Sequence, residues 1–105
     1  VRAILQAIVA AKVPPKSIVA LPQPEWSRSP AASSFGTPAE LGAAITAMNT
    51  ILRAEAEAIG ARYLDLYPLM QRQAAANMLA RDGLHPSARA YDEWAAAIFE
   101  SIPSP

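Results

Sequence analysis

A chain of 105 residues and 11.1 kDa is long enough for one hydrophobic core and too short for two domains. Nine Lys and Arg balance nine Asp and Glu without forming a basic cluster, so we expect no nucleic-acid partner. The absence of cysteine excludes a disulfide framework, thiolate metal sites and a cysteine nucleophile. No apolar run approaches the length of a membrane span, so we expect none.

The first predicted elements are a helix over residues 1–12 and a short strand over residues 17–21. The apolar residues of the helix share one face: Val1, Ile4, Leu5 and Ile8. No capping residue precedes this helix, which suggests that it continues from sequence upstream. The run 17–21 is short, apolar and bounded by prolines, and this pattern is typical of a strand buried on both faces of a parallel sheet.

The middle of the chain predicts a surface loop over residues 22–36 and then a long helix. Thr37 and Glu40 form a capping box, and Pro38 occupies the first helical position. Gly60 ends the helix. One apolar stripe is expected along it: Leu41, Ile45, Met48 and Leu52.

The last third predicts a strand over residues 61–67, a weaker helix over 69–80 and a final helix capped by Ser87. The final helix carries an apolar stripe: Tyr91, Trp94, Ala95, Ile98, Phe99 and Ile102. Strands separated by a long helix cannot form a hairpin, so we expect them to be parallel and joined by a right-handed crossover, or separated by other strands of one sheet. Two parallel strands are too few for a stable covered sheet. Charged residues are also only 17% of the chain, against about 25% in a typical domain. We therefore expect residues 1–105 to be the C-terminal part of a larger α/β domain.

Asp82 and His85 are the strongest candidates for chemistry. A carboxylate three positions before an imidazole, across a turn, can accept a hydrogen bond from one ring nitrogen and leave the other free as a base. Gly83 allows the bend, and Pro86 holds His85 in an extended conformation. The structural alternative is that Asp82 caps the turn and His85 is solvated. With one His and no Cys, neither a metal site nor another cofactor is expected.

The segment Arg-Asp-Gly-Leu-His-Pro-Ser at 81–87, followed by a closing amphipathic helix, resembles the C-terminal block of the SGNH hydrolases, the GDSL esterases and lipases. Residues 18–22 resemble the fourth strand of that family, and residues 63–66 resemble its fifth. Asn49 lies in the long helix, where the family often has Asn.

The resemblance implies a flavodoxin-like, three-layer α/β/α fold with a parallel sheet, of which this chain is the C-terminal part. It implies ester hydrolysis through an acyl-enzyme, with His85 as general base and Asp82 fixing its tautomer. The family's Gly-Asp-Ser nucleophile block and the Gly and Asn blocks of its oxyanion hole are absent from the sequence. The implied partners are therefore the N-terminal portion of the same hydrolase and a small ester substrate.

The other polar candidates have weaker support. The eight serines lie in no nucleophile motif: Ser17, Ser27, Ser29, Ser33, Ser34, Ser87, Ser101 and Ser104. Asn49 and Asn77 are expected on helices in surface or packing roles, and Asp65 at the end of a strand. Trp26 is either a loop aromatic without function or part of an acyl pocket at the carboxyl edge of the sheet.

Two further hypotheses compete with the esterase. The sparse charge and apolar stripes also suit a non-catalytic interaction module that docks on another protein. A degenerate hydrolase fold that has lost its nucleophile is the third. The sequence leaves the acyl and alcohol groups of the substrate open.

Overall fold

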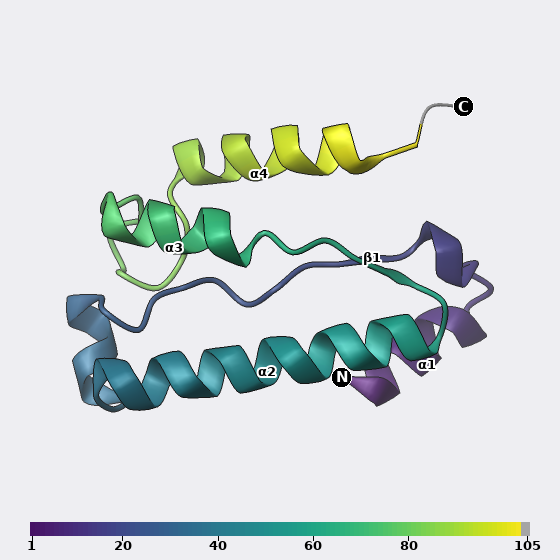
Figure 1. Ribbon diagram of the computed structural model, residues 1–105, viewed down its shortest axis with the longest axis horizontal. Helices are drawn as coiled ribbons and strands as arrows, with labels where there is room; N and C mark the ends of the chain where they lie inside the picture. The colour runs from purple at the N-terminus through teal and green to yellow at the C-terminus, as the bar shows by residue number, and fades with distance from the viewer. Residues whose placement is uncertain (104–105) are drawn as a thin grey trace.

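The computed structural model describes residues 1–103. It contains the helices α1 (Arg2–Ala10), α2 (Pro38–Ala58), α3 (Tyr67–Ala75) and α4 (Ala88–Ser101), the 3-10 helices η1 (Pro15–Ser17) and η2 (Pro30–Ser34), and the strands β1 (Val19–Ala20) and β2 (Arg62–Tyr63) (Figure 1). The chain therefore combines helices with a parallel strand pair, which is compatible with the predicted α/β class. Within the described part, no helix is both long and apolar enough to cross a bilayer.

The two strands pair in parallel, with Val19 opposite Arg62 and Ala20 opposite Tyr63. Both are shorter than the sequence pattern predicts. Residues 15–17 form η1 instead of extending β1. Tyr67 begins α3 instead of ending β2, because Pro68 suits the first turn of a helix and Asp65 Oδ1 accepts a hydrogen bond from Tyr67 N at 3.1 Å.

Helix α2 begins at the predicted capping box. Glu40 N donates to Thr37 Oγ1 at 3.2 Å, and Thr37 N donates to Glu40 Oε2 at 2.9 Å. The predicted apolar stripe is partly wrong. Met48 is 44% exposed, while the neighbouring Asn49 is buried together with Ile45 and Ala56.

Helices cover the strands from two sides: α2 lies on one side, and α3 and α4 lie on the other (Figure 1). One buried cluster, on the α2 side, consists of Ala20, Ala56 and Ala61. The other consists of Leu66, Met70 and Trp94. Trp94 Nε1 donates to Gln73 Oε1 at 2.8 Å, and Gln73 Nε2 donates to Glu93 Oε2 at 2.7 Å, so a buried polar network joins α3 to α4.

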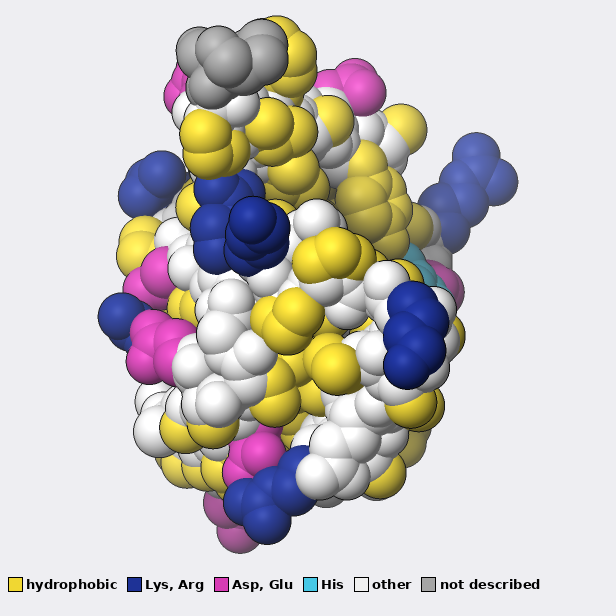
Figure 2. All heavy atoms as spheres, turned by 90° about the vertical axis from the view of Figure 1, so that its right-hand side faces the viewer, with side chains coloured by type: hydrophobic (Ala, Val, Ile, Leu, Met, Phe, Trp, Pro, Cys, Tyr) yellow, Lys and Arg dark blue, Asp and Glu magenta, His cyan; other side chains and the backbone are white. Residues whose placement is uncertain are grey.

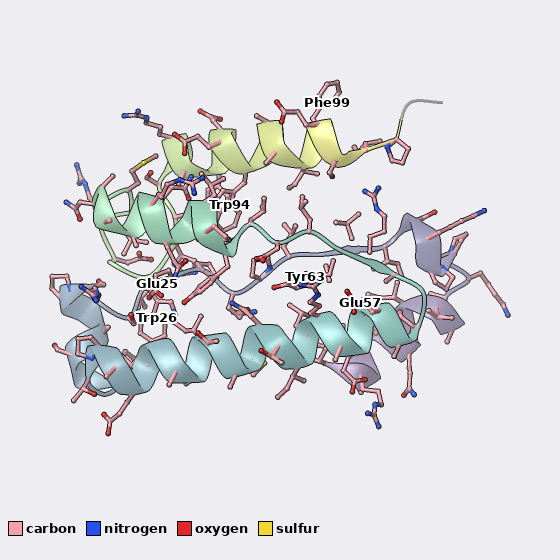
Figure 3. The ribbon with its side chains drawn as sticks, viewed as in Figure 1. Glu25, Trp26, Glu57, Tyr63, Trp94 and Phe99 are labelled. Atoms are coloured by element: carbon pink, nitrogen blue, oxygen red, sulfur yellow. The ribbon has the colours of Figure 1, made fainter. Side chains whose placement is uncertain are left out.

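Several large apolar side chains remain exposed. On α4, Ala90 and Trp94 are buried, whereas Phe99 is 77% exposed and points away from the other elements (Figure 3). The predicted stripe of α4 is therefore wrong at four positions that are exposed: Tyr91, Ala95, Phe99 and Ile102. Hydrophobic side chains also gather around the end of α4 and in the centre of the face shown in Figure 2.

Candidate functional site

The segment between α3 and α4 is closed on itself by backbone hydrogen bonds. Leu79 and Pro86 form an antiparallel bridge. Ala80 N donates to His85 O at 2.7 Å, and Ser87 N donates to Met78 O at 2.9 Å. The residues between these bonds therefore form a fixed turn, which we call the dyad loop (residues 80–86), that holds Asp82 and His85.

Asp82 and His85 are in direct contact. Asp82 Oδ2 lies 2.5 Å from His85 Nδ1, and Asp82 Oδ1 accepts hydrogen bonds from Leu84 N at 2.9 Å and His85 N at 3.0 Å. These backbone bonds, from His85 first and Leu84 second, together with the ring contact, hold the pKa of Asp82 well below its ordinary value. The carboxylate is therefore ionised at neutral pH and fixes the orientation of the ring.

The imidazole of His85 is largely open to solvent. The side chain of His85 is 71% exposed and that of Asp82 is 47% exposed. Within residues 1–103, Asp82 is the one hydrogen-bond partner of the His85 ring. When Nδ1 donates to the carboxylate, Nε2 carries the lone pair and can accept a proton from a hydroxyl that approaches from outside.

The loop that follows β1 lies against the dyad loop. A pocket of about 300 Å³ separates them, and its lining includes Trp26, Ser29, Asp82 and Gly83. Trp26 makes an edge-to-face contact with Phe35, with ring centroids 5.8 Å apart. Trp26 and Asp82 thus line the same pocket, and Figure 3 shows Trp26 at the end of the molecule where the strands have their carboxyl ends.

Five serines of the described chain have local structural roles. Ser29 and Ser87 accept hydrogen bonds from Ala31 N and Ala90 N as the caps of η2 and α4. The hydroxyls of Ser33, Ser34 and Ser101 donate to backbone carbonyls of their own turns. No hydrogen bond between a serine hydroxyl and His85 is present in the described part of the chain, and Ser104 lies outside it.

Asn49 lies on α2 in a packing role, as predicted, whereas Asn77 does not lie on a helix. Asn49 is buried, and its Oδ1 accepts a hydrogen bond from Gln23 N at 2.6 Å. It therefore ties α2 to the loop that carries Trp26. Asn77 lies after the end of α3 rather than inside a helix, with φ of +56°, and it lines the pocket beside the dyad.

One cluster was not predicted from the sequence. Glu25 Oε2 accepts a hydrogen bond from Tyr67 Oη at 2.5 Å, and Glu25 Oε1 accepts one from Ser27 N at 2.8 Å. Burial opposes the charge of Glu25, but the hydrogen bonds from Ser27 and Tyr67 outweigh it and leave its pKa lowered. Glu25 and Tyr67 line a groove of about 920 Å³ near the start of α2, where Figure 3 shows Glu25. No local motif joins two residues 42 positions apart, so the sequence gives no signal for this pair.

The described residues hold no group of three or more His, Asp or Glu side chains placed to bind a metal ion. No family model, no curated protein and no solved structure matches the chain.

Proposed function

We propose that this chain supplies the histidine and the acid of a serine esterase of the SGNH type. The observation that carries the proposal is the contact between Asp82 Oδ2 and His85 Nδ1 at 2.5 Å. The His85 side chain that makes this contact is 71% exposed. The open ring nitrogen and the ionised partner are what a general base for a serine hydroxyl requires.

In the proposed reaction, a serine from the N-terminal portion of the protein attacks the ester carbonyl. His85 Nε2 takes the hydroxyl proton and gives it to the leaving alcohol, and an acyl-enzyme remains. A water molecule then attacks the acyl group while His85 takes a proton from that water. His85 returns the proton to the serine oxygen as the acid product leaves. Asp82 holds Nδ1–H and stabilises the imidazolium that forms in each half.

The shape of the chain supports a covering portion of protein. A compact monomer of this mass exposes about 5,700 Å², whereas the accessible surface here is 6,902 Å². Its radius of gyration is 14.9 Å, against about 13 Å for a compact domain of this size. The two-stranded sheet and the exposed apolar residues of α1 and α4 point the same way.

The decisive experiment is labelling of the complete protein with a serine-directed fluorophosphonate, followed by mapping of the labelled residue. We expect label on a serine outside residues 1–105. His85→Ala is expected to lower both labelling and turnover of 4-nitrophenyl acetate by roughly 10²- to 10⁴-fold without loss of folding. Near-normal turnover in that variant rejects the assignment.

A non-catalytic interaction module is the second candidate, and the exposure of Phe99 and Ile102 favours it. The two functions differ in the labelling experiment, because a docking module or a degenerate fold takes up no fluorophosphonate. Under the esterase proposal, residues 1–105 alone are inactive and do not melt cooperatively. A sharp thermal transition of the isolated chain contradicts its role as part of a larger domain.

A further inference from the structure

The pocket between the loop after β1 and the dyad loop has the size of a small binding site. Its volume of about 300 Å³ equals that of about ten water molecules in the liquid, at about 30 Å³ each. Trp26, Pro30, Ala31 and Leu79 give it apolar walls. A flat apolar group the size of a benzene ring, with one polar substituent, fits such a space.

Among the described residues, the charged side chains of this pocket lining that have no side-chain partner are cationic. Asp82 is the one carboxylate in its lining, and both Asp82 oxygens are occupied by Leu84 N, His85 N and the His85 ring. Arg28, Arg81 and the amide of Asn77 also line it. Within residues 1–103, neither guanidinium takes part in a side-chain hydrogen bond or ion pair.

The charge of Arg28 contributes to the lowered pKa of the neighbouring Glu25, but no hydrogen bond or ion pair joins the two side chains within residues 1–103. Glu25, in the adjoining groove, has its two oxygens occupied by Ser27 N and Tyr67 Oη. Two guanidinium groups and one ionised carboxylate leave the pocket lining with a net charge of one positive unit. This charge complements a single carboxylate, and a guanidinium binds a carboxylate with two parallel hydrogen bonds.

We propose that this pocket binds small carboxylates with a flat apolar body. A second part of this inference rests on the proposed function: the protein prefers esters that carry a second, ionised carboxyl group, such as monoesters of dicarboxylic acids. Arg28 and Arg81 recognise that carboxyl group, and Trp26 packs against the apolar body.

The binding test uses the complete protein and titrates it with sodium benzoate and with benzamide, its neutral analogue. The indole N–H signals report the site by NMR, because Trp26 lines the pocket while Trp94 is buried and hydrogen-bonded to Gln73. We expect benzoate to shift the Trp26 signal, and benzamide to bind at least about 10-fold more weakly, the factor that corresponds to about 1.4 kcal/mol.

Charge-removing variants locate the anion. Arg28→Gln and Arg81→Gln should each weaken benzoate about 10-fold, since each removes one charge-assisted pair. Arg72→Gln, at the end of α3 and outside the pocket lining, is the matched control and should change the affinity less than about twofold. Equal binding of benzamide and benzoate, equal losses in all three variants, or no saturable shift of Trp26 overturns the proposal.

The activity arm compares mono(4-nitrophenyl) glutarate with 4-nitrophenyl pentanoate, which has a similar length and no charge. A kcat/KM at least about 10-fold higher for the glutarate, lost in Arg28→Gln or Arg81→Gln, supports the substrate class. Equal rates for the two esters overturn it. If neither ester is hydrolysed, the proposed function fails, while the benzoate titration still decides the binding site.

Discussion

Gly83 lies directly against Ser29. A Cβ added to Gly83 would come 2.5 Å from Ser29 Oγ and 3.1 Å from the Cβ of Ala31. Gly83 also has φ of +68°, a backbone conformation that residues other than glycine rarely adopt. The dyad loop therefore packs on the first turn of η2 through the one residue that has no side chain to obstruct it.

Replacing this glycine should disturb the dyad. Gly83→Ala is expected to lower the free energy of unfolding by about 1–2 kcal/mol from backbone strain alone and to shift the NMR signals of the His85 ring. Gly60→Ala is the matched control, because Gly60 has φ of +80° but its nearest contact for a Cβ is Pro15 Cβ at 3.7 Å. Equal His85 shifts in both variants contradict a positioning role for the Gly83–Ser29 contact.

Asp82→Asn should slow ester turnover by at least about 100-fold, since loss of the acid from a serine protease triad costs about 10⁴ in kcat. Asp92→Asn on α4 controls for the removal of one negative charge. Wild-type turnover in Asp82→Asn excludes Asp82 from the mechanism and leaves His85 in place.

The same carboxylate predicts a dependence of stability on pH. Because folding lowers the pKa of Asp82, the stabilisation is complete above about pH 4, where Asp of the unfolded chain is ionised. It declines as the pH falls further, toward the lower pKa of the folded state. Urea midpoints of wild type and Asp82→Asn should therefore converge below about pH 4. A gap that widens in acid contradicts this linkage.

Tyr67→Phe should destabilise the protein by about 1–2 kcal/mol in urea unfolding at neutral pH, because the carboxylate of Glu25 loses its phenol donor. Tyr91→Phe is the control, since Tyr91 is 48% exposed. Burial, followed by the hydrogen bond to Glu25 and the charge of Glu25, raises the pKa of Tyr67 to about 12.

The folded state therefore favours the neutral phenol of Tyr67. Its contribution to stability is complete below about pH 10, the pKa of tyrosine in the unfolded chain, and is lost as the pH rises toward 12. Absorbance at 295 nm should accordingly show a late-titrating tyrosine that Tyr67→Phe removes. A titration unchanged by the substitution argues against the pair.

Asn49→Ala should cost about 1–3 kcal/mol, because it leaves the amide of Gln23 without its acceptor. Thr50→Ala removes an exposed hydroxyl bonded to Thr46 O on the same helix and serves as the control. Urea unfolding of the two variants measures the difference. Equal costs contradict an anchoring role for Asn49.

The sequence predicted the starts of helices well where capping side chains mark them. Thr37, Glu40 and Ser87 act within one turn of their own helix, and the structure shows each as a cap. The contact of Asp82 with His85 spans three residues, so it too is visible in the sequence. Its catalytic role stays a prediction.

The features that the sequence did not predict depend on distant packing. The apolar periodicity of α2 predicted that Met48 is buried. In the structure, the loop after β1 brings the backbone amide of Gln23 against α2. The polar Asn49 is buried there instead, because its side chain accepts the hydrogen bond of that amide. The strand patterns extended too far, because a run of apolar residues does not reveal where its pairing partner stops. The Glu25–Tyr67 pair and the pocket beside Asp82 arise from loops that meet in three dimensions.

The backbone bonds that join residues 78–80 to residues 85–87 make the dyad loop a self-contained turn. Both members of the dyad, and every hydrogen bond of the Asp82 carboxylate, lie inside it. We expect such a short sequence to move as a unit: grafted between two helices of a scaffold that leaves room beside Gly83, it should carry an imidazole already oriented by its own acid.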